Sequence, residues 1–480
     1  MLEYAIIGAG FGGIAMARAL HDAGVANFRV FEKAAEVGGT WRENHYPGAA
    51  CDVPSHLYSL ADAPNPDWTR LFPQKPEIQA HLRVLGSELV ARGQIEFRWQ
   101  LSAASWDAQD QSWLLENAQG ERCRARTLVL ALGGLHVPAY PEIPGLGSFR
   151  GEAFHSARWR HDLPLSGKRV AVIGTGASAI QFIPAIAPQV ASLSVCQRSP
   201  AWLMPRTDIE FSPRLKRAFA RWPWLRKTLR GSIFTLLELL SSALIHRRTA
   251  FWARAMSRRH LRKQVADPAL RARLTPDYPF GCKRVLISSD YYPALQLPQV
   301  ELIDTPVTAV EPEGLLLADG RRLPADVLIH GTGFKPLDVL SGLRIIGRDG
   351  RQLDVDWARR PQAHLGISPH GYPNLHFLLG PNTALGHNSV LYMIESQVRH
   401  ILALRRAMAE YGARSVEATA AAQQGYLDRV DRGFGDSAWA GGCHSWYLDD
   451  AGQNIALWTG SCVGYRWLTR KVRDGDYVFA

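Results

Sequence analysis

The sequence is poor in cysteine and contains no long uninterrupted apolar run. Its six cysteines are scattered over 480 residues without any Cys-x-x-Cys motif. This spacing argues against a disulfide scaffold, a metal site of the zinc type and a dithiol reductase centre. The first apolar strand begins at about Glu3, so no secretory signal peptide is expected. The cytoplasm, a reducing compartment, is therefore the expected location.

Acidic residues are nearly absent from one segment. Residues 214–273 hold sixteen of the 55 Lys and Arg residues but only two acidic ones, Glu238 and Asp267. The excess positive charge is thus local, and no motif that reads nucleic acid accompanies it, so no nucleic-acid partner is expected. The apolar run Ile233–Ile245 within it is shorter than the roughly twenty residues that a membrane span needs. We interpret the segment as a helical cap with a solvated basic face, the alternative being peripheral contact with an anionic membrane.

Three segments combine an apolar strand, a Gly-rich turn and a helical pattern. They begin near Tyr4, Arg169 and, more weakly, Asp326. Strands that alternate with helices favour parallel sheets, so the predicted fold class is α/β with two Rossmann-like dinucleotide-binding domains, for FAD and NADP. The predicted boundaries are 1–140 and 338–480 for the FAD domain and 141–337 for the NADP domain, which carries a basic helical insert at about 212–275. A small antiparallel meander is predicted around 95–116.

The first Gly-rich turn has the full context of a dinucleotide site. Gly8, Gly10 and Gly13 follow a strand and open a helix, which allows a tight turn, close approach of a pyrophosphate and close helix–strand packing. The helix N-terminus offers free N–H groups to phosphates. Glu32 lies nineteen residues after Gly13, where a carboxylate would hold ribose hydroxyls and repel a 2′-phosphate. The pattern therefore predicts FAD or NAD at this site, and not NADP.

The second Gly-rich turn differs at the ribose position. Gly174, Gly176 and Ser178 belong to the same kind of loop, with Ala in the third glycine position. Nineteen residues after that alanine the strand ends at Arg198 and Ser199, with no carboxylate. A guanidinium pairs with phosphate in a bidentate manner, so this site is predicted to take NADPH. Two such sites describe a protein that passes hydride from NADPH to a flavin.

Further motifs resemble those of type I Baeyer–Villiger monooxygenases, within the flavin-containing monooxygenases. The family fingerprint is matched by Phe149, Gly151, His155 and Trp159, although Arg160 stands where the family has Pro or Asp. Other matching stretches run over 38–52, 331–334, 380–383 and 445–447, so the resemblance covers nearly the whole chain. It implies that NADPH reduces FAD, that oxygen adds at the flavin C4a, and that the peroxyflavin converts a ketone to an ester or lactone.

The resemblance also implies roles for individual residues. The catalytic arginine of the family falls on Arg284, and Asp52 matches the carboxylate that positions it. A fixed cation of this kind suits oxyanions beside the flavin. Lys283 is expected to hold the 2′-phosphate together with Arg198, and Trp446 to touch the nicotinamide end. The remaining residues expected to bind cofactor are Gly39, Thr40, Trp41, Val53 and Tyr58, together with Asp52 itself.

Other functions remain open at this stage. The first alternative is oxygenation of amine nitrogen or sulfide sulfur by a sister flavin-containing monooxygenase, which needs no stabilised oxyanion. An NADPH oxidase and a non-enzymatic nucleotide-binding protein are lesser alternatives. The expected partners are a small-molecule ketone and O2, and neither the ketone nor the oligomeric state follows from the sequence. His155 is expected to couple domain movement to cofactor binding and not to act as an acid or base.

Overall fold

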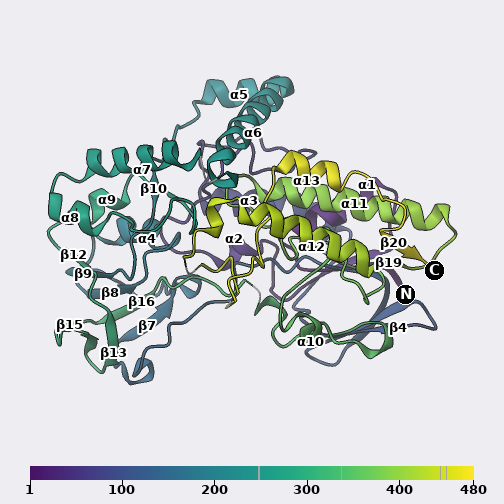
Figure 1. Ribbon diagram of the computed structural model, residues 1–480, viewed down its shortest axis with the longest axis horizontal. Helices are drawn as coiled ribbons and strands as arrows, with labels where there is room; N and C mark the ends of the chain where they lie inside the picture. Colours follow the sequence, from purple (N-terminus) through teal and green to yellow (C-terminus); the bar gives the residue numbers. More distant parts are fainter. Residues whose placement is uncertain (247–248, 337, 444, 450) are drawn as a thin grey trace.

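The chain forms two α/β bodies, each built around its own sheet with parallel central strands. Both termini lie on the first body (Figure 1). The computed structural model describes residues 1–246, 249–336, 338–443, 445–449 and 451–480. Apolar strands that are buried on both faces need a cover on either side. In each body one face of the sheet packs against helices and the other against antiparallel strands. The predicted α/β class is confirmed.

The first sheet has eight strands, in the order β17-β4-β5-β6-β1-β2-β3, with β18 also paired to β6. Its strands β1, β2, β3, β6 and β18 pair in parallel, whereas β4, β5 and β6 form an antiparallel meander. The meander predicted near 95–116 therefore lies further along the chain, because Ile95–Phe97 joins the parallel part. The strands are β1 (Leu2–Ile7), β2 (Phe28–Glu32), β3 (Ile95–Phe97), β4 (Leu101–Asp107), β5 (Ser112–Asn117), β6 (Arg122–Leu130), β17 (Arg344–Ile346) and β18 (Leu375–Phe377).

Helices from both ends of the chain pack beside this sheet. α1 contacts both α3 and α11, and α11 contacts α13. Their buried faces form one apolar core with β1 and β2, which includes Ile14, Leu82 and Ile394. The N-terminal nucleotide loop is thus supported by helices that lie almost four hundred residues later in the sequence. The helices are α1 (Phe11–Asp22), α3 (Lys75–Ala91), α11 (Val390–Glu410), α12 (Ala420–Gly435) and α13 (Cys462–Leu468).

The second sheet is wholly parallel, in the order β12-β9-β8-β16-β7. The helix α4 (Ala179–Ile186) leaves the second Gly-rich turn and packs on α9 (Tyr291–Ala294). An antiparallel three-stranded sheet, β13-β14-β15, stands beside it. The strands are β7 (Glu152–His155), β8 (Arg169–Ile173), β9 (Ser192–Cys196), β12 (Val300–Ile303), β13 (Val307–Glu311), β14 (Gly314–Leu317), β15 (Arg322–Pro324) and β16 (Val327–His330).

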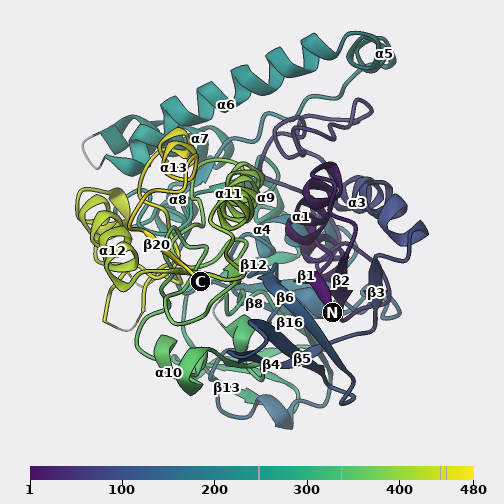
Figure 2. The same cartoon turned by 90° about the vertical axis from the view of Figure 1, so that its right-hand side faces the viewer.

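The basic segment forms four helices, and α6 extends away from the two bodies toward α5 at its outer end (Figures 1 and 2). Its two acidic residues each accept backbone hydrogen bonds. Glu238 accepts hydrogen bonds from the backbone N–H of Cys462 and from Asn388, and Asp267 caps the N-terminus of α8. Among the described residues, no helix is long and apolar enough to cross a membrane. The helices are α5 (Pro213–Arg221), α6 (Pro223–Ile245), α7 (Ala250–Gln264) and α8 (Pro268–Arg273).

Shorter elements complete the chain. Two small sheets pair β10 with β11 and β19 with β20, and the second of these ties the C-terminus to the segment after α11. These elements are α2 (Thr40–Glu43), β10 (Leu203–Met204), β11 (Leu286–Ile287), α10 (Leu353–Trp357), β19 (Val416–Ala418) and β20 (Tyr477–Phe479).

Six buried histidines make the fold sensitive to acid. Burial lowers the pKa of His56, His81, His155, His330 and His400 to about 4, and that of His376 to about 3. The unfolded chain would bind these protons near pH 6.5, so the stability is complete above about pH 6.5 and falls as the pH drops toward 4. We expect the urea midpoint, followed by tryptophan fluorescence, to fall steeply between pH 7 and 5. An unchanged midpoint over this interval would contradict the buried neutral state of these side chains.

Candidate functional site

The first Gly-rich turn is packed so tightly that Gly8 and Gly13 have no room for a Cβ atom. A Cβ atom on Gly13 would lie 1.8 Å from the carbonyl oxygen of Gly8. The turn of Gly38 and Gly39 packs against Gly10, and the N–H of Gly38 donates to the carbonyl of Ala9 at 3.0 Å. Helix α1 then starts at Phe11, immediately beyond this contact. The loop therefore presents the N-terminus of α1 next to the start of α2, which contains Thr40.

The buried carboxylate of Glu32 ends β2 and organises this loop. It accepts the backbone N–H of Ala9 at 2.8 Å and that of Ala34 at 3.0 Å, and it pairs with Arg42 at 3.1 Å. A carboxylate has about four lone-pair sites, so one further hydroxyl donor can still be accepted. Glu32 thus fixes the loop geometry in addition to any contact with a ribose.

Aromatic side chains from three segments meet beside the first loop. The indole N–H of Trp41 donates to the hydroxyl of Tyr58 at 3.0 Å, and the ring of Phe11 lies 5.4 Å from that of Tyr58. Trp41 and Tyr58 are almost fully buried. Val53 packs partly buried against the same core, and its N–H donates to the sulfur of Cys51. These contacts fix the segment that ends at Asp52.

The second Gly-rich turn repeats the first in the other sheet. Gly174 has a φ of +104°, and a Cβ atom there would lie 2.5 Å from the carbonyl oxygen of Gly331. Above Gly176 the space is open, because a Cβ atom there would meet nothing nearer than 3.9 Å. Ser178 directly precedes α4. The loop thus leaves room for a group to approach the backbone at the start of a helix.

Two cations gather at the end of β9. Lys283 donates to the hydroxyl of Ser199 at 3.0 Å and lies over the ring of Tyr278. Burial, and next the positive charge of Arg198, lower the pKa of Lys283. Two like charges held together in this way repel each other, and an anion between them would remove that repulsion.

Arg284 and Asp52 form an ion pair. Arg284 lies in the loop after α8, and Asp52 lies directly before Val53. The guanidinium of Arg284 donates to the carboxylate of Asp52, although 232 residues separate them in the sequence. Burial acts to raise the pKa of Asp52, but Arg284 outweighs it and holds that pKa below its usual value. Asp52 in turn raises the pKa of Arg284. Their side chains remain 30% and 33% exposed, so the charged pair faces a space that a ligand can enter.

A C-terminal loop covers this ion pair. Tyr447 is buried beside it and has no hydrogen-bond partner for its hydroxyl among the described residues, and burial raises the pKa of Tyr447 to about 12. The neighbouring Trp446 is 39% exposed. Cys443 in the same loop forms a disulfide with Cys282, next to Lys283. The scattered cysteines did not predict this bond, because its two residues lie 161 positions apart.

One contact that the sequence did not reveal joins the segment before Asp52 to the helix that follows the second nucleotide loop. Gln181 on α4 accepts from the hydroxyl of Tyr46 at 2.9 Å and donates to the carbonyl of Ala50 at 3.0 Å. It also accepts the N–H of Ala50. The segment that carries Asp52 is thereby fastened to the helix that begins at the second Gly-rich turn. A single Gln on a helix gives no sequence signal of such a role.

The fingerprint segment contains β7, the edge strand of the second sheet. His155 is fully buried, accepts the N–H of Ala157 at 3.1 Å, and packs its ring against Tyr140 and Phe334. Arg160, which departs from the family pattern, is held at the surface by Glu152 and Asp162. That departure therefore lies outside the packed part of the motif.

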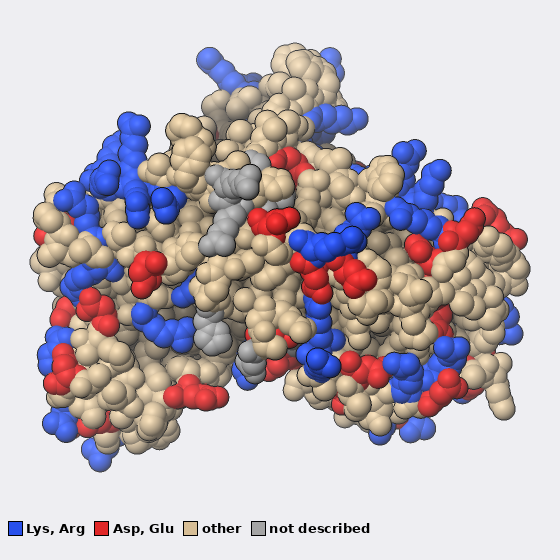
Figure 3. All heavy atoms as spheres, viewed as in Figure 1, with Lys and Arg blue, Asp and Glu red and all other residues tan. Residues whose placement is uncertain are grey.

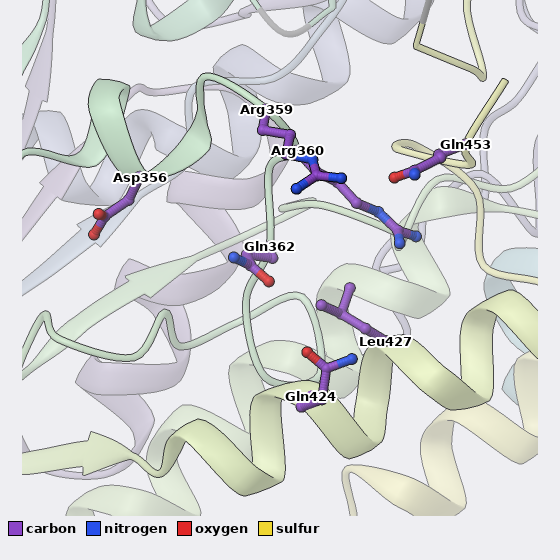
Figure 4. Close-up of a pocket in the computed structure, with 7 residues that line it drawn as sticks. All are labelled: Asp356, Arg359, Arg360, Gln362, Gln424, Leu427 and Gln453. Carbon is purple, nitrogen blue, oxygen red and sulfur yellow. The ribbon is translucent and has the colours of Figure 1, made fainter. Parts of the chain in front are cut away.

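Two other features lie apart from the ion pair. A cavity of about 410 Å³ is lined by Arg359, Arg360 and three glutamines, among others, and contains none of the predicted site residues (Figure 4). Arg360 in its wall already pairs with Asp431. Among the described residues, one group with metal-ligand spacing was found, Glu238, His387 and Cys462. Its carboxylate is occupied by hydrogen bonds, as described above.

Removal of Gln181 tests its role in joining the segment before Asp52 to α4. Gln181→Ala leaves the groups of Tyr46 and Ala50 without partners, and we expect the free energy of unfolding to fall by about 1–3 kcal/mol. Gln189→Ala, an exposed glutamine shortly after the same helix, is the matched control and should change it by less than about 0.5 kcal/mol. If urea denaturation gives the same free energy of unfolding for Gln181→Ala and Gln189→Ala, the contact of Gln181 with Tyr46 and Ala50 does not stabilise the fold.

Comparisons with known proteins agree with this geometry. The family model of pyridine nucleotide-disulphide oxidoreductases matches residues 2–221. A Baeyer–Villiger monooxygenase of Pseudomonas aeruginosa is 43% identical, over 99% of this chain and 91% of its own length. A Baeyer–Villiger monooxygenase of Streptomyces coelicolor is 41% identical, over 99% of this chain and 92% of its own length.

Solved structures give the same result for the whole chain. An oxidised steroid monooxygenase bound to NADP superposes with a TM-score of 0.89 at 29% identity, covering 100% of this chain and 99% of the other. The OTEMO complex with FAD and NADP gives a TM-score of 0.89 at 27% identity, with the same coverage. Because relatives above 40% identity match along nearly its full length, the chain belongs to the Baeyer–Villiger monooxygenase family.

Proposed function

We propose that the protein is an FAD-containing, NADPH- and O2-dependent monooxygenase that converts ketones to esters or lactones. The observation that carries this proposal is the ion pair of Arg284 and Asp52, which lies where the segments from the two Gly-rich turns meet. The names of the relatives and the cofactors in the similar solved structures support it. When bound, FAD accepts hydride from NADPH and activates O2.

Domain boundaries follow from this assignment. We propose an FAD-binding domain of residues 1–140 and 338–480, and an NADP-binding domain of 141–337 with a helical insert at about 212–275. In support, the first sheet takes its strands from 2–130 and 344–377, and the second from 152–330.

The first loop provides a fitting place for FAD. Gly8, Gly10 and Gly13 would hold the pyrophosphate at the N-terminus of α1, and Glu32 would accept a ribose hydroxyl. Gly39 packs on Gly10, which brings the start of α2 beside the place where the phosphates would approach. The residues proposed to line the remainder of the flavin site are Thr40, Trp41, Asp52, Val53 and Tyr58.

The second loop provides a fitting place for NADPH. The open space over Gly176 would receive the pyrophosphate, next to Gly174 and Ser178. Arg198, Lys283 and Ser199 would hold the 2′-phosphate, because an anion relieves the repulsion between the two cations. Trp446 would cover the nicotinamide end.

Arg284 supplies the charge that distinguishes this chemistry. Its guanidinium cannot release a proton at physiological pH, and Asp52 raises its pKa further. It would therefore stabilise negative charge that develops on oxygen during transfer to the ketone carbonyl. Asp52 orients the guanidinium, and Gln181 fixes the segment that carries Asp52. Oxygenation of an amine or sulfide needs no such cation, so the pair favours a ketone substrate.

Replacement of Arg284 separates these two functions. We expect Arg284→Ala to lower ketone oxygenation by two to three orders of magnitude, about 3–4 kcal/mol, because negative charge on oxygen loses its stabilising cation. Oxygenated product is measured by mass analysis under saturating NADPH, and anaerobic bleaching of the flavin by NADPH serves as the internal check. Arg160→Ala, a surface arginine, should leave turnover unchanged. Undiminished ketone turnover in Arg284→Ala would refute the assignment.

Replacement of Arg198 tests the second cofactor. We expect Arg198→Ala to reduce the preference for NADPH over NADH by roughly ten- to a hundredfold, since a hydrogen bond to a charged group contributes about 1.5–3 kcal/mol. The measurement is the rate of flavin reduction at varied concentrations of each coenzyme. Arg214→Ala, an exposed arginine on α5, is the control. If both variants keep the wild-type preference, Arg198 does not contact the 2′-phosphate.

The proposed partners are a small-molecule ketone and O2, and the proposed location is the cytoplasm. The argument from scattered cysteines is weakened by the disulfide between Cys282 and Cys443. The proposal of location therefore depends on the two cofactors, which are supplied inside cells.

A further inference from the structure

Large apolar side chains are exposed in unusual number on the basic helices. Of the twenty exposed large hydrophobic side chains among the described residues, eight lie between positions 222 and 256. Trp252 is 71% exposed, Trp224 62% and Leu236 56%. Singly exposed apolar residues are common on proteins, but a concentration in one segment of 35 residues marks an interaction surface. Figure 2 shows α6 lying along this side of the molecule, with α5 at its end and α7 beneath it.

The inner face of α6 is fastened to the segments around the site. Arg230 donates to the carbonyls of His56, Leu57 and Ser59, directly after the segment that carries Asp52. Phe234 stacks on Tyr392 of α11 at 4.7 Å. Glu238 accepts the N–H at the start of α13. These three inward side chains follow one another at intervals of four residues, as expected for one face of a helix.

The opposite face of α6 carries exposed apolar side chains. Leu236 and Leu240 stand two residues beyond Phe234 and Glu238, which is about 200° around the helix. Both leucines are more than half exposed. The helix α7 contacts α6 and adds Phe251 and Trp252, whose rings lie 4.6 Å apart. A helix of this length spans roughly 34 Å, so α6 forms a rigid ridge with an apolar outer side.

Positive charge surrounds this apolar ridge. Lys and Arg side chains gather over α7 and at the outer end of α5 and α6 (Figure 3). Glu238 is partly buried and bonded to the start of α13, so Asp267, which is exposed at the N-terminus of α8, is the acidic residue of this segment that offsets part of the exposed positive charge. The exposed basic residues on these three helices are Arg214, Arg217, Arg221, Lys227, Arg254, Arg258, Arg259, Arg262 and Lys263.

We propose that the outer side of α5, α6 and α7 docks on an anionic phospholipid bilayer. Exposed Trp and Leu side chains would enter the region between headgroups and acyl chains, and the basic residues would contact anionic headgroups. No helix in the described part of the chain can span a bilayer, so the protein would lie on its surface. The inner face of α6 touches the segment after Asp52, so docking would bring the site close to ketones dissolved in the membrane. This last consequence rests on the proposed function, whereas the docking itself does not.

Vesicle binding by the full-length, flavin-loaded protein tests the proposal. We expect cosedimentation at low salt with vesicles that contain phosphatidylglycerol, weak binding to vesicles of phosphatidylcholine alone, and release by added salt. Each basic residue near an anionic surface strengthens binding roughly fivefold. Replacement of Arg217, Lys227, Arg254 and Arg259 by Gln is therefore expected to weaken binding by more than about a hundredfold.

A matched pair of variants tests the apolar contribution. Trp224→Ser with Leu236→Ser and Trp252→Ser should weaken binding at least about tenfold. The control carries Val84→Ser, Val355→Ser and Tyr411→Ser, which are equally exposed residues on other elements, and should bind as the wild type does. The flavin content of each variant reports whether it has folded, independently of monooxygenase activity.

Three results would overturn the proposal. The first is no binding of the wild-type protein to anionic vesicles at low salt. The second is equal loss of binding in the control variant. The third is a dimer of the wild-type protein in light scattering that does not bind vesicles and that the Trp224, Leu236 and Trp252 changes convert to a monomer. That result would identify this face as a contact between two copies of the chain. Loss of ketone oxygenation with intact vesicle binding would instead count against the proposed function alone.

Discussion

The ion pair of Arg284 and Asp52 is the interaction on which the arrangement of the site depends. Each residue belongs to a different nucleotide-binding fold, and each charge stabilises the other at a place where both side chains are only about one third exposed to solvent. Because breaking such a pair leaves an uncompensated charge, the two folds can approach only in an orientation that keeps the partners together. Gln181 binds the segment that carries Asp52 a few residues before that carboxylate. Two polar contacts therefore fix how this segment lies against the second fold.

The C-terminal loop that contains Cys443 and Tyr447 adds further contacts around the ion pair of Arg284 and Asp52. Tyr447 covers it, and the disulfide from Cys443 to Cys282 ties the covering loop to the residue that precedes Lys283. The loop thereby joins the first body to the proposed 2′-phosphate site of the second. A loop attached in this way can respond to what binds at either site, since its position is determined by groups from both.

The sequence predicted the parts of the fold that depend on local physics. Gly13 must be glycine because its Cβ would meet the Gly8 carbonyl, and the alternation of apolar strands and helices is visible without tertiary information. Contacts between residues far apart in the chain could not be predicted from the sequence around them. Nothing near Gln181 signals its hydrogen bonds to Tyr46 and Ala50, and cysteine spacing cannot reveal a bond that is closed only by the fold. Arg284 and Asp52 were paired through family resemblance, and not through any feature of their own neighbourhoods.

Glu238 has a role that its local sequence context does not reveal. In the sequence it interrupts an apolar run and so limits the length of a candidate membrane segment. In the structure its carboxylate is the inward anchor of α6, which accepts hydrogen bonds from the start of α13 and from Asn388. With the inner face fixed by Glu238 and Arg230, the leucines two residues further on must face solvent. The exposed apolar side of α6 is therefore a consequence of how the helix is anchored by these two partly buried side chains.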